Sequence, residues 1–97
     1  MKILALEREE PGLSAAEFQP HLCVEARQAW TLYRSGTIRE LYFSEETHTA
    51  VLVLECATVE EARRALDSLP LVQAGLVRFD IIPLAPYDGF ARLFATE

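Results

Sequence analysis

The chain has 97 residues, of which 51% are hydrophobic and 25% charged, and its formal net charge is −6. This length and composition predict one soluble globular domain over residues 1–97 with a small core. An acidic chain repels a phosphate backbone, and the lysines and arginines are scattered, so we expect no nucleic-acid partner. No apolar run reaches the roughly 20 residues of a membrane helix. Because the charged start is also unlike a signal peptide, we expect a cytoplasmic protein with no membrane partner.

The first elements are predicted by apolar alternation and by capping residues. Residues 2–7 alternate as a short strand does. Ser14 and Glu17 have the spacing of a capping box and predict a helical turn. Pro20 then either kinks one helix or separates this turn from a main helix over about residues 20–35. We favour the separation, because proline is tolerated at the first position of a helix.

The rest of the chain predicts two strands that form a hairpin, then a helix and a strand, over residues 37–43, 49–56, 58–69 and 76–84. Gly36 is placed to end the main helix as a left-handed C-terminal cap. Pro70 stops the second helix and is expected to form a compact Leu-Pro-Leu corner.

This order predicts a ferredoxin-like α+β sandwich, a four-stranded antiparallel sheet with two helices on one face. The strands over 49–56 and 76–84 are apolar on both faces, whereas a strand with one side in water alternates. We therefore expect the uncovered face to lie against a second copy, in a homodimer whose sheets face each other. The apolar tail over 88–97 is expected to pack on that partner. The alternative is a monomer whose tail covers its own sheet.

The segment GTIRELYF over residues 36–43, the Leu69-Pro70-Leu71 corner and the strand after it resemble the muconolactone Δ-isomerases. The resemblance extends over roughly residues 25–83. It implies a cofactor-free enzyme of the dimeric α/β-barrel superfamily that shifts a double bond in a lactone of aromatic catabolism. It also implies further assembly, up to a ring-like decamer. The tail differs from the isomerase C-terminus, so the substrate stays open.

Glu25 falls within the apolar stripe of the main helix. A carboxylate there must be paired, hydrated in a pocket or protonated, because burying it bare is unfavourable. Desolvation raises the pKa of a carboxyl group and suits it to general acid–base catalysis, and the resemblance places a glutamate of the isomerases here. The alternative is an ion pair with Arg39 or Arg78, or a position near the helix edge in water. His21, one turn earlier, is either a partner that tunes Glu25 or a partly exposed side chain.

Five further side chains are candidates for substrate binding or catalysis. Arg39 and Arg78 lie on predicted strands, where a guanidinium could bind an acidic substrate or pair with a neighbouring carboxylate. Tyr33, Tyr42 and Trp30 supply aromatic surface, and a tyrosine hydroxyl could stabilise an enolate. Core packing is the alternative for these three.

Cys23 and Cys56 lack the spacing of a redox or zinc site, so reduced thiols are expected. His48, at the end of the hairpin, is expected to be simply exposed. The sequence shows no nucleophile arrangement, phosphate-binding glycine loop, metal-ligand cluster or flavin signature, so we expect no cofactor and no metal.

The sequence therefore predicts a cofactor-free isomerase or proton-transfer enzyme that acts on a small unsaturated lactone or an acidic substrate. The alternative is a noncatalytic module that binds a small ligand or serves assembly, in which Glu25 is ion-paired and no cavity lies beside it. A cofactor-independent oxygenase of the same superfamily is a third interpretation, which no residue singles out.

Overall fold

The computed structural model describes residues 1–95, so the last two residues of the predicted domain and tail lie outside it. Its elements, in chain order, are β1 (Lys2–Glu9), α1 (Ala15–Phe18), the 3-10 turn η1 (Gln19–His21), α2 (Leu22–Arg34), β2 (Ile38–Phe43), β3 (Ala50–Glu55), α3 (Val59–Asp67), α4 (Pro70–Gln73), β4 (Val77–Pro83) and the 3-10 segment η2 (Gly89–Phe94). Among the described residues, no helix is long and apolar enough to cross a membrane.

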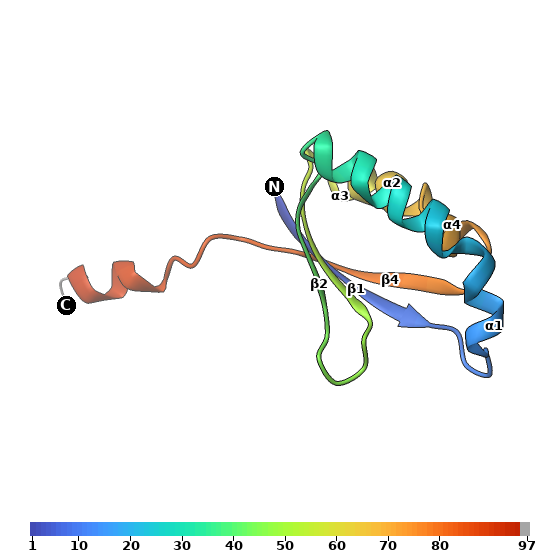
Figure 1. The fold of residues 1–97 in the computed structure, drawn as a ribbon. Helices are drawn as coiled ribbons and strands as arrows, with labels where there is room; N and C mark the ends of the chain where they lie inside the picture. Colours follow the sequence, from blue (N-terminus) through green and yellow to red (C-terminus); the bar gives the residue numbers. More distant parts are fainter. Residues whose placement is uncertain (96–97) are drawn as a thin grey trace.

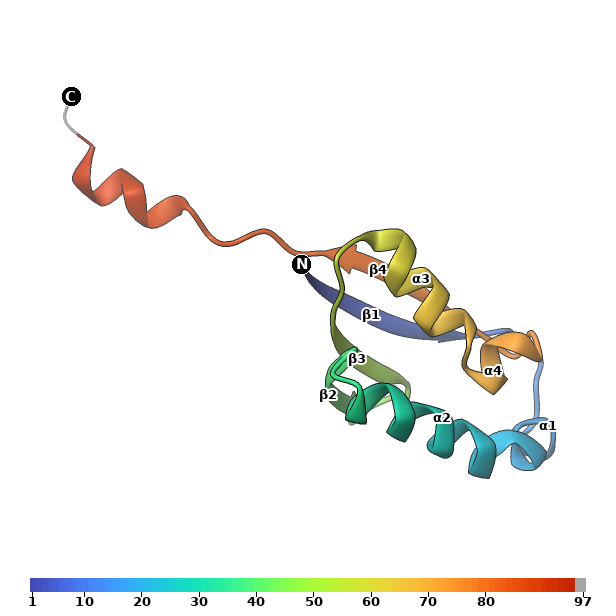
Figure 2. The same ribbon diagram turned by 90° about the horizontal axis from the view of Figure 1, so that it is seen from above.

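The four strands form one antiparallel sheet in the order β2-β3-β1-β4. The helices α2 and α3 cover the same face of this sheet, as Figures 1 and 2 show from the side and from above. The chain therefore has the predicted ferredoxin-like α+β fold. The hairpin of β2 and β3 is also confirmed.

The core lies between the sheet and the helices. Alternation along β1 directs Ile3 and Ala5 toward the helices, and both are fully buried. They pack with residues of β2, β3 and β4 and with the inner side of α3 and α4, namely Ile38, Leu52, Leu54, Ala62, Leu66, Leu69, Leu71, Val77 and Phe79. Glu7 follows in the same alternation, so it also faces the helices.

The region around Pro20 contains two α-helices, α1 and α2, as predicted, and the 3-10 turn η1 joins them. The backbone amide of Ser14 donates to Glu17 Oε2 at 2.7 Å, which is one half of the predicted capping box. α1 ends at Phe18, Pro20 lies in η1, and α2 begins at Leu22, two residues after the expected start. Proline is accommodated because the first turn of a helix leaves its backbone N–H groups without intrahelical partners.

The Leu-Pro-Leu corner differs from the prediction. Pro70 is the first residue of the short helix α4, with Leu69 as its extended N-cap residue. The fixed φ of proline is suited to the first helical position, so the residue that stops α3 also starts α4. This extra turn directs the backbone N–H of Leu71 toward α2, where the side chain of Glu25 accepts its hydrogen bond.

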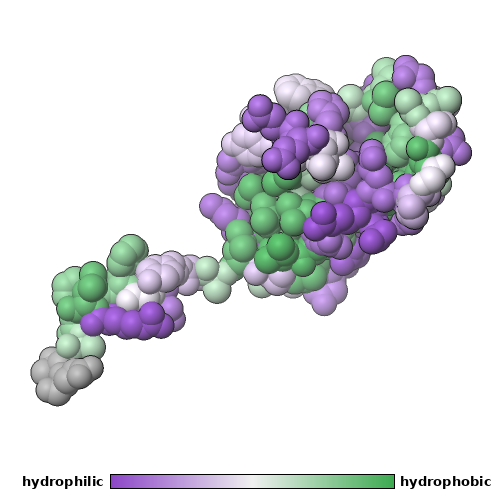
Figure 3. Space-filling view, turned by 90° about the horizontal axis from the view of Figure 1, so that it is seen from below, coloured by the Kyte–Doolittle hydropathy of each residue, from purple (hydrophilic) through white to green (hydrophobic). Residues whose placement is uncertain are grey.

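The face of the sheet away from the helices is uncovered and apolar at its centre. The strand register places Leu4 and Leu6 of β1 on this face together with Tyr42, Val51, Val53 and Ile82. Two ion pairs lie on the same face, Arg8–Asp80 at 2.7 Å and Arg78–Glu10 at 3.2 Å. Figure 3 shows this face from below, with a hydrophobic centre and hydrophilic residues beside it.

The tail does not lie over its own sheet. It leaves the end of β4 as an extended segment and ends in η2, away from the body of the domain (Figure 1). Its apolar side chains Phe90, Leu93 and Phe94 are 67%, 74% and 83% exposed. The described part of the tail therefore does not have the arrangement expected of a monomer that covers its own sheet.

Candidate functional site

A cavity of about 770 Å³ lies between the sheet and the helices α1 and α2. Most of its wall is apolar, from both the strands and the helices. The ionisable residues in its lining are Glu7, Glu9, Glu25, His48 and Tyr42, and the Tyr42 side chain lies on the uncovered face of the sheet. No lysine or arginine among residues 1–95 lines it. A small, mostly apolar cavity with a few convergent polar groups has the form of a small-molecule site.

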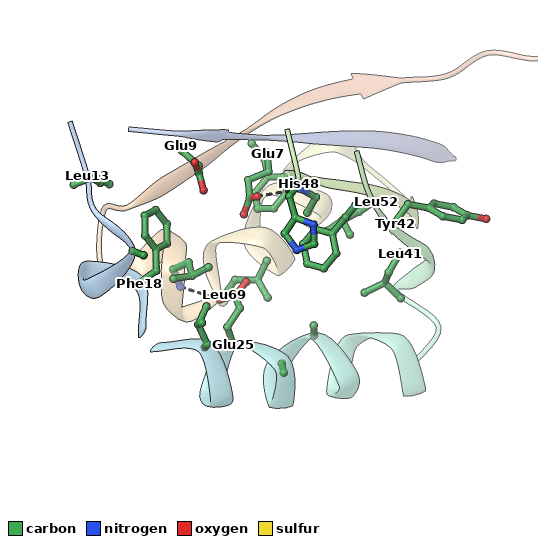
Figure 4. A pocket seen from close by; sticks show the side chains of 18 of the residues that line it. Glu7, Glu9, Leu13, Phe18, Glu25, Leu41, Tyr42, His48, Leu52 and Leu69 are labelled. Carbon is green, nitrogen blue, oxygen red and sulfur yellow. Dashed lines mark hydrogen bonds between the residues drawn. The ribbon is translucent and has the colours of Figure 1, made fainter. Parts of the chain in front are cut away.

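Glu25 projects from α2 into this cavity and is half-buried (Figure 4). Its Oε1 accepts a hydrogen bond from the backbone N–H of Leu71 at 2.9 Å. Burial raises the pKa of the Glu25 carboxyl group, the Leu71 bond lowers it, the charge of Glu7 raises it, and His21 lowers it; the net shift is upward. Glu25 forms no ion pair with any of residues 1–95. A noncatalytic module is expected to have Glu25 in an ion pair and no cavity beside it. Among the described residues, Glu25 has no ion pair and lines a cavity.

Glu7 reaches into the same cavity from the opposite wall, so that the two carboxyl groups point toward one another in Figure 4. Its side chain is 9% exposed, and its Oε1 accepts a hydrogen bond from the backbone N–H of Ala50 at 3.0 Å. Burial is the main cause of its raised pKa; the Ala50 bond and His48 act against the rise, and the charge of Glu9 adds to it. Glu7 is not among the residues predicted from the sequence, although its place in the alternation after Ile3 and Ala5 is a usable signal.

His48 is exposed, as expected, but its ring also forms part of the cavity wall. The ring stacks on Phe43 with the centroids 4.0 Å apart and the planes at 19°. Its backbone φ is 55°, in the left-handed region that residues other than glycine seldom adopt. The imidazole lies on the side of the cavity where Glu7 lies, as Figure 4 shows.

Two of the residues predicted to be catalytic lie at the edge of the site. His21 ends η1 and does not line the cavity, although its charge lowers the pKa of Glu25. Tyr42 lines the cavity, but Figure 4 shows its ring directed away from Glu25. The Tyr42 hydroxyl donates to Glu40 Oε1 at 2.7 Å, and this bond raises the pKa of the phenol.

The residues predicted to bind substrate lie outside the cavity. Arg39 Nε donates to the carbonyl oxygen of Gly36 at 2.6 Å, and Arg78 pairs with Glu10 on the uncovered face. Trp30 and Tyr33 stack with their centroids 5.8 Å apart. With Leu41 they border an adjacent apolar groove of about 370 Å³, whose remaining lining residues are Ala26 and Ala29. Leu41, Ala26 and Ala29 also line the cavity.

The described part of the chain has no group of side chains that could hold a metal ion. No three His, Cys, Asp or Glu side chains among residues 1–95 are grouped closely enough to hold an ion. Cys23 is exposed and Cys56 is buried, and they are not bonded to each other. What the cavity offers chemically is a pair of carboxyl groups in apolar surroundings, an arrangement suited to proton transfer.

Two of the solved structures that share this fold are enzymes. Muconolactone isomerase matches with a TM-score of 0.75 and 21% identity, covering 91% of this chain and 92% of that chain. The 5-chloro-2-hydroxyhydroquinone dehydrochlorinase of Burkholderia phenoliruptrix AC1100, in complex with 2,5-dihydroxybenzoquinone, matches with a TM-score of 0.69 and 15% identity, covering 92% and 98%. No protein-family model and no curated protein matches the chain. The predicted likeness to muconolactone isomerase is confirmed for the fold.

Proposed function

We propose that this protein is a cofactor-free proton-transfer enzyme that moves a double bond in a small unsaturated ring, with Glu25 as its base. The observation that carries the proposal is a half-buried carboxyl group, without an ion pair among residues 1–95, that projects into an apolar cavity. Burial raises the pKa of this carboxyl group, and a raised pKa makes a carboxylate a stronger base. The similar folds of muconolactone isomerase and the dehydrochlorinase support the proposal, because both enzymes are named for small oxygenated rings.

The reaction needs one base and no external reactant. Glu25 takes a proton from the carbon between the carbonyl group and the double bond, which leaves a dienolate. The same carboxyl group then returns the proton to the far end of the conjugated system, so the double bond moves into conjugation with the carbonyl group. The bond from the Leu71 amide holds Oε1 and thereby orients the carboxyl group for both transfers.

The charges of the lining favour an uncharged lactone over an acidic substrate. Glu7, Glu9 and Glu25 line the cavity, and no lysine or arginine among residues 1–95 does. The two arginines considered for a substrate carboxylate bind Gly36 and Glu10 instead. A carboxylate in the cavity would meet like charges without a paired cation, which is unfavourable in partly desolvated surroundings.

The test uses two β,γ-unsaturated butenolides, one unsubstituted and one with a carboxymethyl group. Conversion to the conjugated isomer is followed by ultraviolet absorbance. We expect the wild-type protein to convert the unsubstituted ring with the higher kcat/KM, and Glu25→Gln to lose about 10²–10⁴-fold, the usual contribution of a general base. Glu60→Gln, which removes an exposed carboxylate on α3, is the matched control. Undiminished turnover in Glu25→Gln would exclude Glu25 as the base.

We also propose that the uncovered face of the sheet binds a second copy of this chain, with the tail packed on the partner. The apolar centre formed by Leu4, Leu6, Val51 and Val53 would face its own copy, as the facing sheets of a barrel do. Leu6→Lys should convert a dimer or larger assembly into monomers in sedimentation-velocity experiments. Val24→Lys, on an exposed position of α2, should leave the assembly unchanged. A wild-type monomer at micromolar concentration would contradict this interface.

A further inference from the structure

Only one of the two carboxyl oxygens of Glu7 accepts a hydrogen bond from residues 1–95. Oε1 accepts the hydrogen bond from Ala50, whereas Oε2 accepts none from residues 1–95. Among these residues, no side-chain nitrogen or oxygen that is sealed from solvent lacks a hydrogen-bond partner. Oε2 therefore has accessible surface, although the side chain as a whole is 9% exposed, and Glu7 lines the cavity.

The groups around Glu7 favour its uncharged form. Glu9 lies on the same strand, Glu25 faces it from α2, and His48 faces it from the hairpin. Arg8, the adjacent residue on β1, lies on the opposite face of the sheet and is held by Asp80. Burial and the charge of Glu9 thus oppose ionisation of Glu7, and the Ala50 amide and the imidazole only partly counteract them.

We propose that Glu7 is a second catalytic residue of this cavity, a carboxylic acid that donates a hydrogen bond from Oε2 to the carbonyl oxygen of the substrate while Glu25 removes the carbon proton. This inference rests on the proposed function and deepens it. The acid and the base project from opposite walls, so a flat ring between them would meet one at its carbonyl oxygen and the other at its carbon (Figure 4).

The protons balance without any further reactant. When Glu25 takes the carbon proton, the C–H electron pair forms the new C=C bond and the carbonyl π pair moves onto oxygen. That oxygen takes the proton of Glu7, and an uncharged dienol results. In the second step the oxygen returns its proton to Glu7 while Glu25 delivers its proton to the far carbon. Both carboxyl groups end as they began, and the double bond has moved.

This arrangement also gives the two carboxyl groups different tasks. Two carboxyl groups that share a small cavity do not ionise together readily, because the first negative charge opposes the second. Glu7 is the more deeply buried of the two, since Glu25 is only half-buried. An ionised Glu7 would raise the pKa of Glu25 in turn, so only one of the two is charged at a time. Because Glu7 is the more deeply buried, we assign the proton to Glu7 and the charge to Glu25 in the resting enzyme.

The first test is carbon-13 NMR titration of the glutamate carboxyl groups in the ligand-free protein, with Glu7→Gln and Glu25→Gln as assignment controls. The expected result is that the Glu7 carboxyl is still protonated at pH 7 and titrates at higher pH than Glu25. A Glu7 carboxyl that is ionised at pH 7 would overturn the inference, even if the protein isomerises butenolides.

The second test compares kcat/KM between pH 5 and 9 for the unsubstituted butenolide. Removing one donor to a developing oxyanion lowers rates about 10²–10³-fold, so we expect that loss in Glu7→Leu. Glu7→Gln keeps an N–H donor and the acceptor for Ala50, so we expect a smaller loss, about 10-fold, and a flattened alkaline limb. If Glu7→Leu does not fold, Glu7→Gln alone decides.

The outcomes separate the two proposals. A wild-type rate and pH profile in Glu7→Gln, together with an inactive Glu25→Gln, would overturn the role of Glu7 and leave the base in place. No turnover of either butenolide by the wild-type protein would overturn the proposed function and this inference together. Loss of the alkaline limb in Glu7→Gln, with the acid limb retained, would support both.

Discussion

Replacing Glu25 by glutamine is expected to stabilise the protein at neutral pH while it removes the base. The Glu25 carboxyl group has a raised pKa in the folded protein, because burial outweighs the stabilisation of its charge by the Leu71 amide. Glutamine has nearly the same shape, keeps a carbonyl oxygen for the Leu71 N–H, and has no charge to desolvate. The raised pKa therefore corresponds to a stability penalty at the candidate site at neutral pH.

The sign and size of this effect follow from proton linkage. A group whose pKa is raised on folding contributes its full stability below the unfolded pKa, near 4.5, and loses it as the pH rises through the folded pKa. Above that pH, each unit of elevation corresponds to about 1.4 kcal/mol of lost stability. In a domain of this size, 1 kcal/mol changes the melting temperature by about 4–8 °C. The advantage of Glu25→Gln should thus be near zero at pH 4 and present at pH 8.

The assay is urea and thermal denaturation of the wild-type protein and Glu25→Gln at pH 4 and pH 8. Protein concentration is held fixed, because self-association would alter the apparent stability. Glu46→Gln is the control, since it removes one exposed negative charge from a chain of net charge −6 without affecting the cavity. If Glu25→Gln is no more stable than Glu46→Gln at pH 8, the Leu71 bond outweighs burial and the reasoning is wrong.

Three further expectations concern stability, each measured by urea denaturation. Leu69→Ala should lower the free energy of unfolding by about 2–5 kcal/mol, because Leu69 is 1% exposed in the core; a smaller loss would mean that the cavity wall collapses to fill the space. Thr58→Ala should lower it by about 1 kcal/mol, since the Thr58 hydroxyl accepts the Glu61 amide at 3.1 Å; an unchanged value would show that water replaces this cap. His48→Gly should be about 1 kcal/mol more stable than His48→Ala, because glycine adopts a φ of 55° without strain, and equal stabilities would contradict the left-handed conformation.

Local patterns predicted most of the fold. Capping residues such as Thr58, the left-handed glycine at Gly36 and the alternation of the strands depend on neighbours within a few positions, so the chain itself displays them. The bounds of α2 and β1 shifted by about two residues, and α4 was missed because Pro70 was interpreted only as a stop. Proline at a first helical position was the signal for α4.

The candidate site was predicted only in part. Glu25 was selected because its place in an apolar helical stripe is a local property. Glu7, whose carboxyl group lies across the cavity from that of Glu25, is on a strand 18 positions earlier in the chain. Only the tertiary structure brings Glu7 and Glu25 into the lining of one cavity. Arg78 was considered for the same site, but the alternation of β4 places it on the other face of the sheet, where it pairs with Glu10.

The sequence by itself determined the order of the elements, the faces of each helix and strand, and the exceptional position of Glu25. The tertiary structure decided which faces meet, that α1 and α2 leave a cavity above β1, and that Glu7 and His48 share it with Glu25. The physical reason is that periodicity specifies directions within one element, whereas a site is formed by contacts between elements distant in the chain. Those contacts depend on how side-chain volumes pack across the whole core.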